Sequence, residues 1–149
     1  MTEPSFHLSF SVQESDIDPL GHANNIAYVR WVQDAAVAHS DAVGFDYDAY
    51  TKLGGIFVIR RHEVDYLRPV LRGERLDART WVCRVLAARC ERATEIVRTS
   101  DGAVVAKAMT VWVFIDQTTG RPARIPASVR DAFQKPVTQL PDHRPWPGA

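Results

Sequence analysis

The chain has 149 residues, enough for one domain with a well-buried core. Apolar residues make up 46% of the sequence and charged residues 24%, which is typical of a soluble globular protein and argues against disorder. Eighteen basic residues balance eighteen acidic ones, so the whole molecule has no net charge to attract nucleic acid or an anionic membrane. The N-terminus lacks a secretory pattern, and no apolar run approaches the ~20 residues that span a bilayer, so no membrane association is expected.

The first predicted element is a strand over residues 6–12, where apolar and polar side chains alternate. A helix follows, with Asn24 or Asn25 as its N-cap and Gly44 as its stop. At 1.5 Å per residue, a helix of about 18 residues is roughly 27 Å long, which is enough to cross a whole sheet. Its predicted buried stripe, spaced at three and four residues, is Ile26, Val29, Val32, Ala36, Val37, Ser40 and Val43.

Four strands are expected next, without another helix between them, at 56–67, 75–88, 92–100 and 103–115. The sequence Asp-Gly at 101–102 is typical of a tight hairpin, so the last two strands should pair antiparallel. A short helix is predicted from Pro126, and the tail 136–149 has four prolines, which favours an extended or disordered segment. The layout is α+β, with a single domain over 1–135. One helix leaves sheet surface to cover, so a dimer is expected.

The sequence gives little indication of a metal site or of a disulfide. Cys83 and Cys90 are seven residues apart, with no Cys-x-x-Cys and no clustered histidines, so we expect no zinc site and no disulfide framework. Two thiols of this kind indicate a reducing, cytoplasmic location. The other histidines, His7, His39, His62 and His143, are scattered and are interpreted as surface or core residues.

The segment "ESDIDPLGHANNIAY" at 14–28 concentrates polar side chains just before the predicted helix. A turn with a helix cap needs one such residue. Here five fall within ten positions: Asp16, Asp18, His22, Asn24 and Asn25. A calcium loop starting at Asp16 fails, because its fifth and twelfth positions are Leu20 and Ala27. The sequence has no phosphate-binding Gly-rich loop near these residues, which argues against a magnesium site. It also has no Gly-x-Ser-x-Gly elbow, which argues against a serine nucleophile.

What remains is a carboxylate beside the N-terminus of a long helix. Unpaired N–H groups and the positive end of the helix dipole can hold a carbonyl oxygen as it becomes an oxyanion. A nearby carboxylate can attack the carbonyl or deprotonate a water. Gly21 allows close approach of the backbone. The pattern therefore favours acyl-transfer chemistry.

The segment "SDIDPLGHANNIAYVRW" resembles the signature of the 4-hydroxybenzoyl-CoA thioesterase family of hotdog-fold acyl-CoA thioesterases. The matching residues are Asp16, Asp18, Gly21, His22, Asn24, Asn25 and Tyr28. Two further blocks resemble the family in the correct order, "VDYLRPVLRGERL" and "VWVFIDQTTGRPARIP", so the resemblance spans roughly residues 8–133. It implies an antiparallel sheet wrapped around one long central helix, in a homodimer or homotetramer. It also implies hydrolysis of an acyl-CoA to a free acid and CoA, without metal or other cofactor.

The resemblance also assigns roles within the site. Asp18 is the implied catalytic carboxylate, acting as nucleophile or general base, and Asp16 braces the turn. A backbone N–H near Asn25 is the implied oxyanion donor, and Tyr28 is a core residue or pocket wall. His22 either assists as a base or makes a structural hydrogen bond. Segment 54–59 of the other subunit is expected to wall the site.

Binding of CoA, which carries phosphates, is expected to involve basic residues at the rim of the site. Arg60, Arg61, Arg89 and Arg92 are candidates because they are expected near strand ends or on solvent faces, although ordinary solvated arginines would give the same pattern. Two other functions stay open, a non-catalytic acyl-thioester binder and an enoyl-thioester hydratase. The sequence does not distinguish acyl length, an aromatic from an aliphatic acyl group, or CoA from acyl carrier protein.

Overall fold

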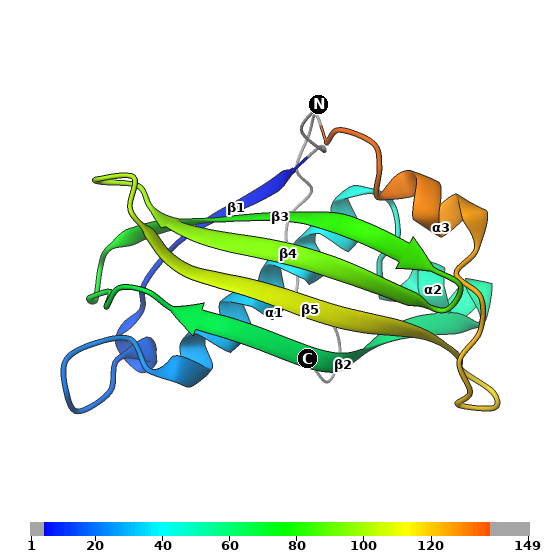
Figure 1. Ribbon diagram of the computed structural model, residues 1–149, viewed down its shortest axis with the longest axis horizontal. Helices are drawn as coiled ribbons and strands as arrows, with labels where there is room; N and C mark the ends of the chain where they lie inside the picture. The colour runs from blue at the N-terminus through cyan, green and yellow to red at the C-terminus, as the bar shows by residue number, and fades with distance from the viewer. Residues whose placement is uncertain (1–4, 138–149) are drawn as a thin grey trace.

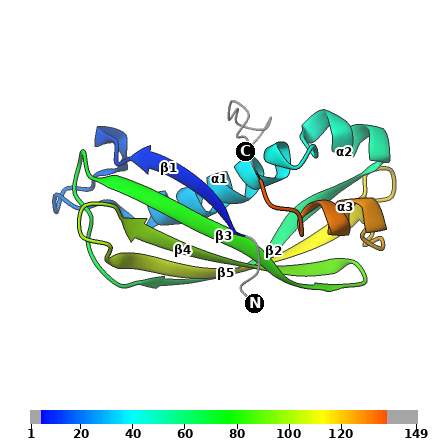
Figure 2. The same ribbon diagram turned by 90° about the horizontal axis from the view of Figure 1, so that it is seen from above.

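The computed structural model describes residues 5–137 as an antiparallel sheet with one long helix across it (Figure 1). The strand order is β1-β3-β4-β5-β2, and all neighbouring strands are antiparallel. The strands are β1 (Phe6–Ser11), β2 (Gly55–Tyr66), β3 (Arg75–Leu86), β4 (Arg89–Arg98) and β5 (Val104–Asp116). Figure 2 shows the helices gathered on one face of the sheet. The predicted α+β layout is confirmed.

Helix α1 (Asn25–Ala42) begins and ends where local sequence predicts. The Asn24 side chain accepts a hydrogen bond from the Ala27 N–H at 2.7 Å, and Gly44 adopts a φ of 94° beyond the last turn. Most of the predicted stripe is buried or half-buried, but Ile26 is 77% exposed, so that part of the prediction was wrong. In this first turn Ala27 and Tyr28 are buried instead.

The prediction that strands follow α1 directly was also wrong. Helix α2 (Tyr47–Leu53) lies between α1 and β2. The Asp46 side chain accepts a hydrogen bond from the Ala49 N–H at 2.8 Å, and Gly54 ends the helix with a φ of 83°. Two turns are too few for a clear apolar period, so only these end signals marked it. A 3₁₀ turn, η1 (Glu14–Asp16), precedes the polar loop.

The other local predictions agree with the structure. The Asp-Gly hairpin joins β4 to β5, with the Arg98 N–H donating to the Ala103 carbonyl at 2.8 Å. Helix α3 (Ala127–Ala132) follows Pro126. Cys83 and Cys90 are not joined by a disulfide. Most of the predicted tail lies outside the described residues, so the domain boundary stays a prediction. Within the described part of the chain, no helix is both long and apolar enough to cross a membrane.

The core consists of two apolar clusters beneath the two halves of α1. The first gathers around Tyr28, Trp31 and Leu76, and the second around Tyr50, Trp112 and Phe114. Buried polar residues also lie on the inner face, among them Thr80, Arg92 and Thr110. Arg92 is 4% exposed, so the expectation that it lies on a solvent face was wrong. The strand period of two places it on the same face as the buried Cys90 and Ile96.

Candidate active site

The polar segment before α1 forms a closed loop at one end of the molecule (Figure 1). An isolated bridge pairs Ile17 with Ala23, and the Asp18 N–H donates to the His22 carbonyl at 2.8 Å. The Gly21 N–H donates to the Asp18 carbonyl at 3.0 Å, with Gly21 at a φ of 86°. That backbone conformation strongly favours glycine, which explains its position in the loop.

Asp16 fixes this loop to the rest of the protein. Its side chain is 1% exposed, accepts a hydrogen bond from the Gln13 N–H at 2.8 Å and forms an ion pair with Arg30. Its backbone carbonyl accepts from the Asn24 N–H at 2.8 Å, so it also positions the N-cap of α1. The geometry agrees with the bracing role expected for Asp16.

Asp18 occupies a different environment, at the edge of a surface pocket of about 260 Å³. Its Oδ1 accepts hydrogen bonds from the Leu20 N–H at 2.9 Å and the His22 N–H at 3.4 Å. Within residues 5–137, Oδ2 has no hydrogen-bond partner. The pocket is lined by Asp18, Leu20, His22, Ala23, Asn25, Tyr28, Tyr66, Leu67, Arg68 and Pro69.

The first turn of α1 supplies hydrogen-bond donors to the same pocket. Asn24 caps the Ala27 N–H, whereas the N–H groups of Asn25 and Ile26 have no acceptor in the part of the chain that the structure describes. Asn25 lines the pocket together with Asp18. Asp18 and Asn25, whose backbone N–H is unpaired among the described residues, therefore line the same pocket, which is the combination that acyl-transfer chemistry uses.

Aromatic residues form the opposite wall. The Tyr28 hydroxyl donates to the Arg68 carbonyl at 3.1 Å, and burial raises the pKa of Tyr28 above its ordinary value. The Tyr28 and Tyr66 rings meet edge to face, with centroids 5.2 Å apart. The Tyr66 hydroxyl donates to the Asn25 carbonyl at 3.4 Å. Tyr28 is thus a pocket wall whose hydroxyl is already engaged.

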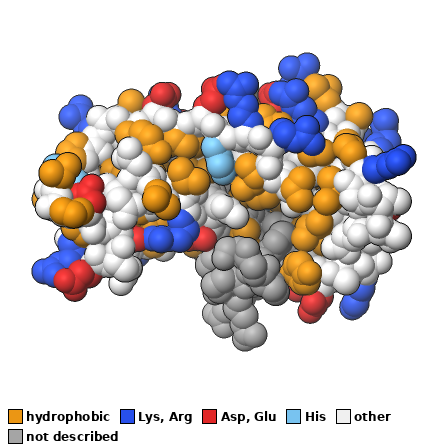
Figure 3. Space-filling model, turned by 90° about the horizontal axis from the view of Figure 1, so that it is seen from below, with side chains coloured by type: hydrophobic (Ala, Val, Ile, Leu, Met, Phe, Trp, Pro, Cys, Tyr) orange, Lys and Arg blue, Asp and Glu red, His pale blue; other side chains and the backbone are white. Residues whose placement is uncertain are grey.

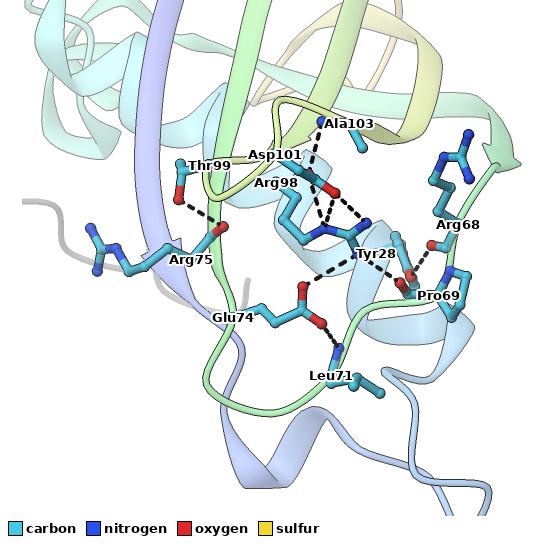
Figure 4. A network of polar contacts seen from close by, with 10 residues as sticks. All are labelled: Tyr28, Arg68, Pro69, Leu71, Glu74, Arg75, Arg98, Thr99, Asp101 and Ala103. Atoms are coloured by element: carbon cyan, nitrogen blue, oxygen red, sulfur yellow. Dashed lines mark hydrogen bonds and ion pairs between the residues drawn. The ribbon is translucent and has the colours of Figure 1, made fainter.

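The segment that carries Arg68 and Pro69 is held by the network in Figure 4. Arg98 on β4 donates to the Pro69 carbonyl at 3.2 Å, pairs with Glu74 at 3.3 Å and binds Asp101 in the β4–β5 turn. The hydrogen bonds from Arg98 and from the Ala103 N–H lower the pKa of Asp101 to about 2. The pocket wall is therefore anchored to both β4 and the hairpin.

The structure brings together most of the residues predicted for the site. Asp18, His22, Asn25 and Tyr28 line one pocket, and Gly21 shapes its loop. The His22 side chain has no hydrogen bond within the described ranges, so the alternative of a structural hydrogen bond gains no support there. Arg60 and Arg61 lie on β2 and Arg89 begins β4, and none of the three lines this pocket.

Sequence reasoning missed Tyr66 and Arg68 as pocket residues. Both stand in the block "VDYLRPVLRGERL" that carried part of the family resemblance, and this was the available signal. Arg68 is the basic residue that lines the pocket itself. Among residues 5–137, no group of three or more His, Cys, Asp or Glu side chains is placed to hold a metal ion.

The sequence of the chain is similar to those of known proteins. A family model described as the thioesterase-like superfamily matches residues 12–133. The chloroplastic acyl-acyl carrier protein thioesterase ATL3 of Arabidopsis thaliana is 24% identical over 129 residues, which are 86% of this chain and 67% of that protein. The chain spans only 34% and 32% of two other curated relatives that it matches. These matches support acyl-thioester hydrolysis.

Solved structures share the architecture. A 1,4-dihydroxy-2-naphthoyl-CoA thioesterase from Synechocystis superposes with a TM-score of 0.80 at 18% identity, covering 87% of this chain and 95% of that one. A thioesterase from Thermus thermophilus, complexed with coenzyme A and zinc, superposes with a TM-score of 0.75 at 27% identity, covering 88% and 92% of the two chains. The hotdog fold expected from the sequence is confirmed.

Proposed function

Because the chain belongs to the thioesterase-like superfamily, we propose that it hydrolyses an acyl-CoA to a free acid and CoA. The observation that carries this proposal is the pairing of Asp18 with the first turn of α1. The Asp18 carboxylate, with Oδ2 unengaged by the described residues, borders the same pocket as Asn25 and its unpaired N–H. That pairing supplies both a base or nucleophile and an oxyanion donor.

In the proposed reaction, the thioester carbonyl lies between Asp18 and the start of α1. Asp18 takes a proton from a water as the water oxygen attacks the carbonyl carbon. The carbonyl oxygen becomes an oxyanion and accepts a hydrogen bond from the Asn25 N–H. The intermediate then collapses, the carbon–sulfur bond breaks, and the proton returns to the departing CoA sulfur.

A nucleophilic route fits the same residues. Asp18 attacks the carbonyl directly, CoA leaves, and water hydrolyses the resulting acid anhydride. Hydrolysis in ¹⁸O-labelled water under single-turnover conditions identifies the nucleophilic route when the label enters the Asp18 carboxylate, because water has then attacked the Asp18 carbonyl carbon of the anhydride. Label in the released acid alone is expected from direct attack by water on the thioester, and also from attack by water on the acyl carbon of the anhydride. Neither route has a step that needs a metal ion.

The other pocket residues have supporting roles in the proposal. In this proposal His22, which is exposed and lines the pocket, shuttles the proton between Asp18 and the leaving sulfur. Tyr28 and Gly21 shape the pocket, and Arg68 presents a cation to the phosphates of CoA. Arg60, Arg61 and Arg89 remain candidates for phosphate contacts further from the reacting carbonyl.

We further propose that two copies associate through β2. This strand is the last in the sheet, so one of its edges has no neighbour within residues 5–137. Figure 3 shows hydrophobic side chains along a face of the molecule, and Leu53, Val58 and Tyr66 are among the exposed large apolar residues. Pairing of β2 with a second β2 would bring segment 54–59 of one copy toward the pocket of the other. Analytical ultracentrifugation tests this, with a mass of at least twice 16.7 kDa expected.

The activity is tested by thiol release from a panel of acyl-CoAs, with acyl carrier protein thioesters as a second arm. Asp18→Asn keeps the hydrogen bond to Leu20 but removes the charge, and it should lower kcat by ~10²-fold or more. Asp48→Asn, an exposed carboxylate on α2, is the matched control. Near-wild-type turnover by Asp18→Asn contradicts the assignment. Binding without thiol release indicates an acyl-thioester binder, and loss of enoyl absorbance indicates a hydratase.

A further inference from the structure

A separate cavity of about 40 Å³ lies under the C-terminal half of α1. It shares no lining residue with the Asp18 pocket. Along α1, Asn25 of that pocket and Ala36 of this cavity are eleven residues apart, roughly 16 Å at 1.5 Å per residue. Its walls are mostly apolar and come from helices and strands far apart in sequence, including Phe57, Val85 and Val129.

Arg92 brings a charge into these apolar walls. Its Nη1 donates to Nδ1 of His39 at 3.0 Å and to Oγ1 of Thr80 at 3.1 Å. The guanidinium carbon lies 5.4 Å from the centroid of the Phe133 ring. These contacts engage Nη1 and a ring face, and none of them is with an anion.

No anion compensates this buried cation among residues 5–137. Arg92 forms no ion pair with an Asp or Glu there, and His39, its closest polar neighbour, is an uncharged acceptor. Burial and the adjacent Arg92 lower the pKa of His39 to about 3, so the ring stays neutral at physiological pH. The other charged residue that lines the cavity is Arg130, which is also basic. A buried charge without a partner is unfavourable, and proteins rarely keep one without a use.

Trp112 provides a second and independent sign of a missing acceptor. Its indole Nε1–H is buried and has no hydrogen-bond partner within the described range 5–137, and the residue lines the same cavity. Buried donors of this kind are almost always paired. Among residues 5–137, the cavity thus offers a guanidinium without a compensating anion and an indole N–H without an acceptor, and no acidic side chain lines it.

We propose that this cavity binds the carboxylate of an organic acid, with Arg92 as the main anchor and Trp112 as a second donor. A carboxylate has three heavy atoms, and 40 Å³ offers room for about three water-sized groups. A phosphate is larger and carries more charge than one buried guanidinium neutralises. Because the carboxylate fills this volume, the apolar remainder of the acid would extend out of the cavity across its apolar lining, with the exposed Arg130 nearby.

Such a carboxylate has two possible sources. It can be a free carboxylic acid, which is also the product class of the proposed hydrolysis, or the far end of an acyl group that ends in a carboxylate. The second source rests on the proposed function, and within one chain it must reach roughly 16 Å from the Asp18 pocket or come from a second copy. The first source does not depend on any catalytic activity.

The first arm of the test is binding of hexanoate, measured by calorimetry and by the indole ¹⁵N–¹H signals, with hexanamide as the uncharged analogue. Hexanoate is expected to bind at least tenfold more tightly than hexanamide and to shift the indole signal of Trp112, identified with Trp112→Phe. Arg92→Met should weaken hexanoate binding at least tenfold. Arg84→Met, an exposed arginine on β3, is the matched control and should bind as wild type.

The second arm compares thiol release from tetradecanedioyl-CoA and tetradecanoyl-CoA, which differ by a terminal carboxylate and are long enough to span the distance between the two sites. If the substrate supplies the carboxylate, Arg92→Met lowers kcat/KM for tetradecanedioyl-CoA at least tenfold and leaves tetradecanoyl-CoA within twofold. Hexanoate binding that depends on Arg92, without such selectivity, assigns the site to a free acid. Arg92→Met that changes neither measurement overturns the proposal. If no acyl-CoA releases thiol, the proposed function is contradicted. The hexanoate binding measurement still tests the proposed carboxylate site in that case.

Folding of the Arg92 variant gives an independent readout. If Arg92 binds the carboxylate, hexanoate should raise the melting temperature of the wild type and not that of Arg92→Met. If Arg92 were only structural, hexanoate would leave both melting temperatures unchanged. Arg92→Lys keeps the charge but loses the planar fork, and it should weaken hexanoate binding by a smaller factor than Arg92→Met. This variant and Trp112→Phe keep the proposal testable if Arg92→Met does not fold.

Discussion

Asp16 and Asp18 are two residues apart, yet the Asp16 carboxylate is buried against Arg30 while the Asp18 carboxylate borders an open pocket beside His22. The turn formed by η1 and the loop separates the two side chains. One carboxylate holds the loop and the N-cap of α1, and the other is available for a substrate. Stability and catalysis should therefore respond separately to substitution at these two positions.

Asp16→Ala is expected to lower the free energy of unfolding by about 2 kcal/mol, because it leaves the Gln13 N–H and the Arg30 guanidinium without their acceptor. Asp18→Asn should change it by less than about 0.5 kcal/mol, since Asp18 is partly exposed and the amide oxygen still accepts from the Leu20 N–H. Urea denaturation followed by circular dichroism measures both. Equal losses in the two variants would contradict the separation of roles.

The sequence predicted the parts of the fold that depend on local signals. The start of α1 follows from the Asn24 cap, its stop from Gly44, and the β4–β5 hairpin from Asp101 and Gly102. The polar loop before α1 was found in the same way, because its polar residues are adjacent in sequence. Helix α2 was missed, since its two turns are too short to show an apolar period.

Features that depend on tertiary structure were harder to predict from the sequence. An arginine on a strand is usually solvated, and only the pairing of β4 between β3 and β5 shows that Arg92 faces the interior. Arg68 reaches the Asp18 pocket because Arg98 and Tyr28 fold its segment against the start of α1. These contacts join residues more than 25 positions apart, which no local pattern reveals.

The pair formed by His39 and Arg92 predicts a pH dependence of stability. The native state keeps His39 neutral with a pKa of about 3, whereas the unfolded chain takes up the proton near pH 6.5. Below pH 6.5 the unfolded state therefore binds one proton more, and the free energy of unfolding falls by about 1.4 kcal/mol per pH unit from this group. The contribution is fully present above pH 6.5 and is lost as the pH falls toward 3.

His39→Gln keeps an acceptor for Arg92 but does not titrate in this range. Denaturation curves at pH 7 and pH 5 should show wild type losing about 2 kcal/mol more than His39→Gln over that interval. Carboxylates titrate in both proteins, so their effect cancels in the difference. Parallel loss in the two proteins would show that His39 is already charged in the folded state.

Tyr28 is predicted to act on substrate binding through the wall of the pocket. Tyr28→Phe removes the hydrogen bond to the Arg68 carbonyl, which should cost about 1 kcal/mol and loosen the segment that carries Arg68 and Pro69. We expect KM for acyl-CoA to rise roughly fivefold with kcat within about twofold. Tyr66→Phe, which loses only a 3.4 Å hydrogen bond, should have a smaller effect. A large fall in kcat for Tyr28→Phe would instead indicate that its hydroxyl takes part in the reaction.

Gly55 at the start of β2 has no room for a side chain. A Cβ placed there would lie 2.3 Å from Cζ and 2.5 Å from Cε1 of Phe114, whose ring is packed in the core. Gly55→Ala should therefore lower the free energy of unfolding by about 1–3 kcal/mol, the usual cost of overpacking. The measurement is urea denaturation at fixed protein concentration, because β2 is also the proposed interface.

A double-mutant cycle identifies the cause of that loss. In a Phe114→Leu background the added methyl should cost at least about 1 kcal/mol less, because the smaller side chain leaves room for it. Gly54→Ala is the comparison, since a Cβ there meets nothing within 4 Å and acts only through the φ of 83°. It should cost about 1 kcal/mol, and the same amount in both backgrounds. If Gly55→Ala were equally costly with Leu at position 114, steric contact with the ring would not be the cause.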